Sequence, residues 1–177
     1  MKTFSKLLLL LLLFNAQLFA ATPGEVKVSE QLRKATLQGL NNRNSTFEAY
    51  KGKPLIINVW ASWCGPCREE MGSLENLSQQ FNGRQFNIIG ISTDDYKEFA
   101  MKFIEESGVS FNNYIDSKLF LENMLGADRI PLTILVDKNG KVLRKVRGAY
   151  QWDHPEIVDA IAKAFNIKLK FKESASK

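Results

Sequence analysis

Apolar runs and alternating apolar and polar positions predict a set of β-strands. Two stretches, Leu55–Trp60 and Gln85–Ser92, are apolar at most positions, which is typical of strands buried in a sheet. Later in the chain, the turn Asp137–Gly140 joins two further stretches into a hairpin. The predicted strands are Lys34–Leu40, Leu55–Trp60, Gln85–Ser92, Leu132–Val136 and Lys141–Arg147.

Apolar residues spaced three and four positions apart predict helices between these strands. One series predicts a helix that begins at Cys64 and ends near Gly83. Its apolar stripe consists of Met71, Leu74, Leu77 and Phe81. Such a stripe is typical of a helix face that packs against a core.

Weaker helical patterns lie elsewhere in the chain. Tyr96–Ser107 predicts a helix that starts at the polar signal Thr93–Asp95 and ends at Gly108. Its residues Phe99, Phe103 and Ile104 are expected to face the core. The other helical segments are a short turn in Ser45–Gly52, Asp116–Leu125, and Ile157–Phe165 with a capping pattern from Asp153 and Glu156.

The order of these elements indicates an α/β fold with a mixed sheet. A strand, a helix and a second strand form one parallel crossover, and the final hairpin adds an antiparallel pair. The chain contains no internal repeat.

The N-terminus has the pattern of a secretory signal peptide. A basic segment, Met1–Lys6, precedes the unbroken apolar run Leu7–Phe14, and a predicted cleavage site follows Ala20. The apolar run is shorter than the roughly 18 to 20 residues that a membrane-spanning helix needs. An uncleaved signal that anchors the protein to the inner membrane is the alternative, since Leu18 and Phe19 are large for a cleavage site.

These patterns set the predicted boundaries along the chain. Residues 1–20 are the signal peptide, 21–33 an N-terminal lead, 34–167 one domain and 168–177 a C-terminal tail. Export would place the domain in the periplasm, where disulfides persist.

The net charge of the chain is only mildly positive and is weak evidence for an acidic partner. The 177 residues carry a formal net charge of +5, part of which belongs to the predicted signal peptide. The densest basic group alternates along a strand, which predicts a solvated face, and a docking patch is the alternative. This group is Lys141, Arg144, Lys145 and Arg147. No nucleic-acid-binding motif accompanies it, so nucleic acid is not an expected partner.

Cys64 and Cys67 are the only cysteines, and their spacing places both sulfurs on one face of the predicted helix. The two sulfurs can therefore form and break a disulfide. Cys64 would lie at the helix N-terminus, where unpaired N–H groups and the helix dipole favour a thiolate and lower its pKa below about 8.5. Cys67, shielded in the first turn, would attack a mixed disulfide formed at Cys64.

Two other readings of the cysteine pair are weaker. A zinc site needs about four ligands, and the chain offers a single histidine, His154, besides the two cysteines. A purely structural disulfide across so short a loop would restrain the unfolded chain little.

On these residues the chain resembles the thioredoxin superfamily, specifically the exported thiol-disulfide oxidoreductases of the TlpA, ResA and DsbE group. The resemblance implies a thioredoxin fold, with a central mixed β-sheet flanked by helices and an N-terminal strand extension. It runs in matching order from about Lys34 to Phe165. The segments that carry it are Lys51–Pro54, Asn58–Glu70 around the cysteines, Arg129–Asp137 and Gly148.

The resemblance also assigns roles around the cysteine pair. Pro131 matches the family's cis-proline beside the redox pair, and Ile130 before it would shape which substrates dock. Trp63 matches an exposed aromatic next to the nucleophile, whereas Trp60 is expected to be part of the core. Gly65 and Pro66 between the cysteines resemble the reducing thioredoxins more than the oxidising Dsb proteins.

The proton acceptor for Cys67 departs from the thioredoxin pattern. Cytoplasmic thioredoxins carry a buried aspartate at the position of Asn58, and asparagine cannot titrate. Glu70 matches an acid of the exported group and is the candidate proton relay, with a solvated helix face as the alternative. His154 is a weaker candidate for a role in the site, because it has no identifiable partner in the sequence.

The expected function is dithiol–disulfide exchange in the periplasm, with the protein as a reductant. The redox-active disulfide of Cys64 and Cys67 would be its only cofactor. Clients would be proteins with disulfides, such as apocytochromes c. A membrane thiol donor of the DsbD or CcdA type would supply the electrons. The protein itself is expected to be a monomer. The alternatives are a copper-binding thiol protein, because thiolates suit Cu(I), and a disulfide-forming oxidant.

Overall fold

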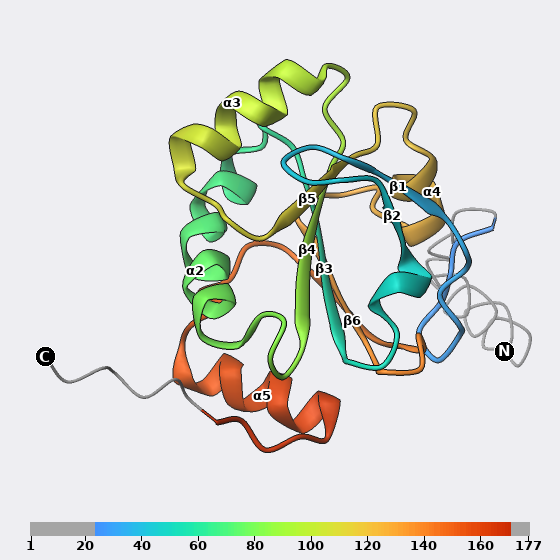
Figure 1. The fold of residues 1–177 in the computed structure, drawn as a ribbon, viewed down its shortest axis with the longest axis vertical. Coiled ribbons are helices and arrows are strands. Elements are labelled where there is room, and N and C mark those ends of the chain that lie inside the picture. The colour runs from blue at the N-terminus through green and yellow to red at the C-terminus, as the bar shows by residue number, and fades with distance from the viewer. Residues whose placement is uncertain (1–23, 171–177) are drawn as a thin grey trace, which may run out of the picture.

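Seven strands form one mixed sheet in residues 24–170, which is the part of the chain that the computed structural model describes (Figure 1). The strand order is β2-β1-β5-β4-β3-β6-β7. The strands are β1 (Thr36–Gly39), β2 (Ser45–Thr46), β3 (Leu55–Trp60), β4 (Asn87–Ser92), β5 (Asn112–Ile115), β6 (Leu132–Val136) and β7 (Val142–Arg147). The predicted signal peptide and residues 171–177 of the predicted tail lie outside the described residues.

Helices cover both faces of this sheet. They are the 3-10 helix η1 (Phe47–Tyr50) and the α-helices α2 (Gly65–Phe81), α3 (Lys97–Ser107), α4 (Phe120–Leu125) and α5 (Pro155–Phe165). In Figure 1, α2 lies to the left of the sheet, α3 at its upper left, α5 below it and α4 to its right. The mixed sheet flanked by helices is confirmed, and β1 and β2 form the N-terminal strand extension. Within residues 24–170, no helix is long and apolar enough to cross a membrane.

The central strand β3 contributes to two cores because its side chains alternate between the two faces of the sheet. Its even-numbered apolar residues, Ile56 and Trp60, pack in the core that α2, α3 and α5 cover. Its odd-numbered residues pack in the core on the side of α4. Asn58 shares the even-numbered face, and its side chain therefore points toward α2.

The prediction of a single parallel crossover is wrong, because β4 pairs in parallel with both β3 and β5. Strand β5 lacks a hydrophobic signal, since it begins with Asn112 and Asn113. Asn113 is nevertheless buried, where its Oδ1 accepts a hydrogen bond from Trp60 Nε1 at 3.0 Å. A satisfied amide can occupy a buried strand without a large cost.

The predicted helix Tyr96–Ser107 is confirmed as α3, but one of its predicted core residues is wrong. Phe103 and Ile104 are buried, whereas Phe99 is 59% exposed. The helix ends at Gly108, whose φ of 68° lies in the left-handed region that favours glycine.

Three of the predicted helix starts are also wrong. The helix predicted over Asp116–Leu125 begins only at Phe120, as α4, and the Asp116 carboxylate accepts a hydrogen bond from the N–H of Glu122 at 2.7 Å. The helix α3 begins at Lys97 rather than at Thr93–Asp95, because Asp94 is buried and accepts a hydrogen bond from the Ser62 hydroxyl. At the last helix, Asp153 does not act as a cap. Its Oδ2 accepts a hydrogen bond from Asn76 Nδ2 at 2.8 Å and so joins the start of α5 to α2.

The basic group on β7 is only partly a solvated face. Arg144 and Arg147 are exposed, as predicted. The side chain of Lys145 is only 7% exposed and pairs with Glu25 from the N-terminal lead. The prediction of a solvated face is therefore wrong for Lys145, because a carboxylate from a distant segment covers it.

The described part of the N-terminal lead, residues 24–33, packs against the edge of the sheet. Val26 and Leu32 are buried in the core on the side of α4. The N–H of Val26 donates to Met124 O at 2.9 Å, and the N–H of Ser29 donates to Val142 O at 2.8 Å. The lead thus connects α4 with β7.

Candidate active site

Cys64 and Cys67 form a disulfide at the N-terminus of α2. Cys64 is the N-cap residue, and its Sγ accepts a hydrogen bond from the N–H of Cys67 at 3.3 Å. Pro66 lies in the first turn, where its missing N–H is not needed. Cys64 is 6% exposed and Cys67 0% exposed, so Cys64 is the more accessible residue of the pair.

The loop before β6 lies against this disulfide. The Ile130–Pro131 peptide bond is cis, as the resemblance implies. The Ile130 carbonyl oxygen is 3.8 Å from Cys64 Sγ, and Ile130 itself is half-buried. A backbone carbonyl next to the reactive sulfur is an acceptor to which an extended client segment can bind.

The two tryptophans of this region differ as predicted. Trp63 is 71% exposed beside the disulfide, whereas Trp60 is buried. The Trp60 ring lies 5.3 Å from Phe103, centroid to centroid, within the core. The position of Trp63 suits an apolar contact with a client, which stays a prediction.

Glu70 is buried one turn after Cys67 on α2, and the alternative of a solvated side chain is therefore wrong. It is 1% exposed. One carboxyl oxygen accepts from Asn58 Nδ2 at 2.8 Å. The other accepts from Trp152 Nε1 at 2.8 Å and from the N–H of Tyr150 at 3.1 Å.

The burial of Glu70 raises the pKa of its carboxyl group above the ordinary value of 4.5, because removal from water disfavours the charged form. The hydrogen bonds from Trp152, Asn58 and Tyr150 favour the charged form and oppose part of this rise. A carboxyl group with a raised pKa holds its proton at a higher pH than an ordinary glutamate does, which suits a group that relays protons.

Asn58 connects Glu70 to the strand that follows Pro131. Its Nδ2 donates to Glu70 Oε1 and also to Thr133 Oγ1 at 3.0 Å. Its Oδ1 is buried and has no hydrogen-bond partner within residues 24–170. A buried oxygen of this kind can accept a hydrogen bond from a group that becomes a donor when the protonation or redox state of the site changes.

Asp94 holds the loop before Cys64, although no motif in the sequence assigns it to the site. Its carboxylate accepts from the N–H of Ser62 at 2.9 Å and from the Ser62 hydroxyl at 2.6 Å. It also accepts from the Ser92 hydroxyl at 2.7 Å. The signal that could have identified it is its place just after β4, since the carboxyl ends of parallel strands meet at one edge of a sheet.

His154 is exposed at the residue before α5. Within the described residues, its hydrogen bonds are made by its backbone, to Gln151, Ile157 and Val158. Nothing in residues 24–170 joins its imidazole to the disulfide.

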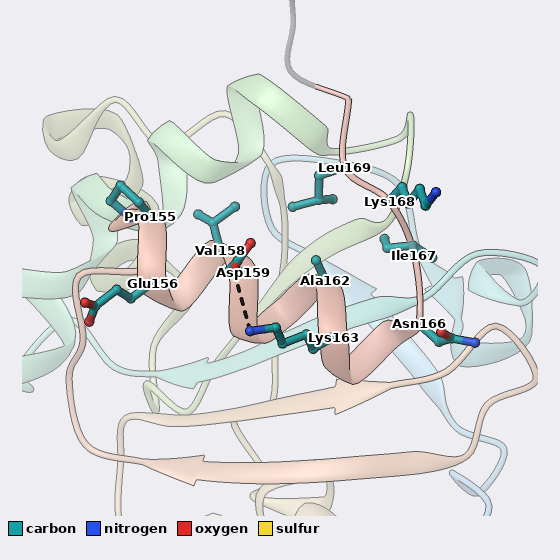
Figure 2. A pocket seen from close by; sticks show the side chains of 10 residues that line it. All are labelled: Pro155, Glu156, Val158, Asp159, Ala162, Lys163, Asn166, Ile167, Lys168 and Leu169. Carbon is teal, nitrogen blue, oxygen red and sulfur yellow. Dashed lines mark ion pairs between the residues drawn. The ribbon is translucent and has the colours of Figure 1, made fainter.

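A groove of about 760 Å³ lies along α5 (Figure 2). It is bordered by α5 and by the segment 166–169 that follows it. Its charged side chains include the exposed pair Lys163 and Asp159, 3.5 Å apart. Neither Cys64 nor Cys67 lines it, so this groove is separate from the redox pair.

Comparisons with known proteins give the family of the chain. The family model described as Redoxin matches residues 27–161. A relative named thiol-disulfide oxidoreductase ResA, from Geobacillus thermodenitrificans, is 32% identical over 112 residues. That alignment covers 63% of this chain and 64% of the relative. ResA from Bacillus anthracis is 25% identical over 130 residues, covering 73% of this chain and 75% of the relative.

Solved structures share the fold. The thioredoxin domain of a thiol-disulfide oxidoreductase from Bacteroides vulgatus has a TM-score of 0.67 at 25% identity, covering 80% of this chain and 100% of that one. A protein described as thiol:disulfide interchange protein DsbE, from Chlorobium tepidum, has a TM-score of 0.73 at 24% identity, covering 80% and 99%. The chain therefore belongs to the Redoxin family, as a thioredoxin-fold protein of the thiol-disulfide oxidoreductase class similar to ResA and DsbE.

Proposed function

We propose that this protein reduces disulfide bonds in exported client proteins through Cys64 and Cys67. The observation that carries the proposal is the position of Cys64, whose sulfur is the more accessible of the pair and lies 3.8 Å from the backbone carbonyl before cis-Pro131. The reacting sulfur and a backbone site for an extended client are thus neighbours. The Gly65–Pro66 pair between the cysteines supports the reducing direction by its resemblance to reducing thioredoxins.

The reaction takes two exchange steps from the dithiol form. The Cys64 thiolate attacks one sulfur of the client disulfide, so that a mixed disulfide forms, the client S–S bond breaks and the leaving sulfur takes a proton. Cys67 then loses its proton and attacks Cys64 Sγ. The mixed disulfide breaks, the client leaves as a dithiol reduced by two electrons, and the protein is left with the Cys64–Cys67 disulfide.

Glu70 is the proposed proton relay for the second step. Cys67 is fully buried and must lose a proton before it attacks, and Glu70 lies one helical turn further along the same helix. Its raised pKa means that it takes up a proton more readily than an ordinary glutamate does, which fits a proton acceptor for Cys67. Asn58 orients this carboxyl by a hydrogen bond and cannot titrate itself.

The proposed location is the periplasm, and it rests on the N-terminal sequence pattern. Cleavage after Ala20 would release the domain, and an uncleaved signal would hold it at the inner membrane. An oxidising compartment requires a supply of electrons, for which we propose a membrane thiol donor of the DsbD or CcdA type. Apocytochromes c, whose cysteines must be reduced before haem attaches, are the proposed clients of a monomeric protein.

Trapping of clients tests this function directly. The Cys67→Ala variant retains Cys64 and lacks the second sulfur, so mixed disulfides should accumulate and can be identified by mass spectrometry after expression of the full chain. The Cys64→Ala variant is the matched control and should trap none. If both variants trap the same proteins in the same amounts, Cys64 is not the attacking residue and the proposal fails.

A further inference from the structure

The segment that presents Ile130 and Pro131 to the disulfide is held by contacts with other parts of the chain. We define the docking loop as residues 126–131, which connect α4 to β6. At its end, the Ile130 carbonyl oxygen lies 3.8 Å from Cys64 Sγ. The place of this loop therefore determines where a client backbone meets the reactive sulfur.

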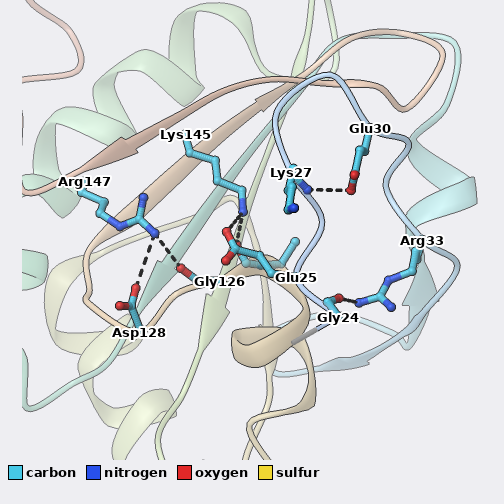
Figure 3. Close-up of polar contacts among 10 residues, drawn as sticks. Gly24, Glu25, Lys27, Glu30, Arg33, Gly126, Asp128, Lys145 and Arg147 are labelled. Carbon is cyan, nitrogen blue, oxygen red and sulfur yellow. Dashed lines mark hydrogen bonds and ion pairs between the residues drawn. The ribbon is translucent and has the colours of Figure 1, made fainter. Parts of the chain in front are cut away.

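Two basic side chains of β7 bind the last residue of α4 and the start of the docking loop (Figure 3). Lys145 Nζ donates to the carbonyl oxygen of Leu125 at 2.8 Å. Arg147 Nη2 donates to the carbonyl oxygen of Gly126 at 3.1 Å and lies 3.4 Å from Asp128 Oδ1. These carbonyls end α4, where the helix leaves its last acceptors without partners in the helix.

Glu25 from the N-terminal lead completes this contact. It forms an ion pair with Lys145, in which the two side chains are 13% and 7% exposed. A buried ammonium without a counter-charge is costly, so Glu25 allows Lys145 to stay below the loop. A Cβ on Gly126 would lie only 2.2 Å from the Glu25 carboxyl, which shows how closely the lead packs on the loop.

The far end of the docking loop is joined to the same strand. The N–H of Gly148, just after β7, donates to Pro131 O at 3.0 Å. Leu132, the first residue of β6, pairs with Arg147. The strand β7 thus contacts the loop at both of its ends, while the side of the loop that carries Ile130 faces Cys64.

We propose that Glu25, Lys145 and Arg147 are positioning residues that set the place of Ile130 and Pro131 for client docking. The inference rests on the proposed function, because it assigns to these residues an effect on protein clients. It does not require them to touch the client or the sulfurs. Loss of the Lys145 ammonium frees the Leu125 carbonyl and leaves Glu25 buried without its partner, so the loop shifts while the disulfide stays in place.

Kinetics with clients of two sizes test the proposal. The full chain is assayed as a reductant of insulin, which must dock on the loop, and of the small disulfide 5,5′-dithiobis(2-nitrobenzoate), which needs only the Cys64 sulfur. In Lys145→Met, kcat/KM for insulin should fall by about ten- to a hundredfold, as expected when a reacting group is displaced by about 1 Å. The rate with the small disulfide and the redox potential should stay at the wild-type values.

Matched variants separate position from general damage. Glu25→Gln should also lower kcat/KM for insulin, as Lys145→Met does. Lys145→Arg should retain most of the activity toward insulin, because arginine keeps a positive charge and a hydrogen-bond donor at this position. Arg144→Met removes an exposed basic side chain from the same strand and should change neither rate. Equal losses toward both substrates in Lys145→Met would overturn the proposal, because they would indicate damage at the sulfurs.

Hydrogen exchange distinguishes this inference from the proposed function. The amide of Ala127 donates to Glu122 O at 2.9 Å, so exchange in a peptide that covers the docking loop reports how firmly the loop is held. It should be faster in Lys145→Met than in the wild type and unchanged in Arg144→Met. If the wild-type protein reduces no insulin, the proposed function fails while faster exchange still supports the positioning role. Unchanged exchange in Lys145→Met overturns the positioning role in either case.

Discussion

Cys64 and Cys67 lie three positions apart, yet the structure gives their sulfurs different environments. Cys64 caps α2, where free N–H groups and the helix dipole stabilise a thiolate. Cys67 lies inside the first turn and is fully buried, and burial disfavours its thiolate. This asymmetry supports the proposal that Cys64 attacks and Cys67 resolves.

After reduction, Cys64 should react with an alkylating agent at lower pH than Cys67 does, because only the thiolate is nucleophilic. Mass spectrometry of protein that is briefly labelled with iodoacetamide over a pH series measures this order. The denatured protein is the control and should label both cysteines alike. Equal labelling of the two sites in the folded protein at neutral pH would contradict the assignment.

Glu70 makes the stability of the folded protein depend on pH in a definite direction. Burial raises its pKa above the ordinary value of 4.5, which is the value expected in the unfolded chain. At a pH between these two pKa values, the folded protein holds a proton that the unfolded chain has released. The free energy of unfolding therefore falls as pH rises through this interval, with a limit of about 1.4 kcal/mol per pH unit for one proton.

In Glu70→Gln this contribution should vanish, because the amide does not titrate. Urea unfolding of the oxidised protein at several pH values measures the difference in slope between variant and wild type. Glu69→Gln, which changes the exposed neighbour on the same helix, should retain the wild-type slope. Parallel curves for Glu70→Gln and wild type would show that the carboxyl titrates at its ordinary pKa.

At the scale of elements, β4 depends on a residue without a side chain. A Cβ on Gly90 would lie 1.9 Å from Asn113 Oδ1 and 2.8 Å from Trp60 Nε1. These are the two atoms of the buried hydrogen bond that joins β3 to β5 across β4. Gly90 is therefore required by the close approach of its neighbours.

We expect Gly90→Ala to lower the free energy of unfolding by about 3 kcal/mol, from overpacking and the broken hydrogen bond together. Thermal or urea unfolding measures the loss. The control is Gly72→Ala, at an exposed position of α2 where a Cβ meets nothing within 4 Å. This change should stabilise the protein by about 0.5 to 1 kcal/mol, since alanine is the better helix former. A Gly90→Ala protein as stable as the wild type would show that β5 can move away from β4.

The elements that were predicted correctly are those with a local signal. Leu55–Trp60 and Leu132–Val136 have the bounds predicted from their apolar runs. Strand β5 was missed because Asn113 is polar, and its burial depends on Trp60, which lies 53 positions away in the chain. Phe99 was misplaced because a periodic pattern does not define which side of α3 the rest of the protein covers.

For the whole molecule, the redox potential of the pair determines the direction of electron flow. A thiolate that is stabilised strongly favours the reduced form and makes an oxidant, as in DsbA at about −120 mV, whereas thioredoxin lies near −270 mV. The buried Glu70, when charged, opposes a thiolate nearby and favours the disulfide. This contribution shifts the pair toward the reducing side.

We therefore expect a potential more negative than about −200 mV, on the thioredoxin side of the two reference values. Equilibration with dithiothreitol or glutathione, followed by the fluorescence of Trp63 beside the disulfide, measures it. The Trp63→Phe variant, read by alkylation, is the control for the optical signal. A value near −120 mV would overturn the reducing direction and leave the fold and the attacking cysteine unchanged.

The sequence by itself determined the features that depend on neighbouring residues. The cysteine pair directly after the strand Leu55–Trp60 places one sulfur at a helix start, and this depends only on the geometry of one helical turn. The cis bond at Pro131 came from the resemblance of Arg129–Asp137 to its family. The local sequence does not predict it, since most X–Pro bonds are trans.

Only the tertiary structure decided which polar residues leave the solvent. The partners of Glu70 lie 12 positions away at Asn58 and 82 positions away at Trp152, and Glu25 meets Lys145 across 120 positions. The cost of burying a charged group depends on the partners that the folded chain brings to it, and a linear pattern does not contain them. Helix α2 thus carries a buried acid where its sequence also allowed a solvated one.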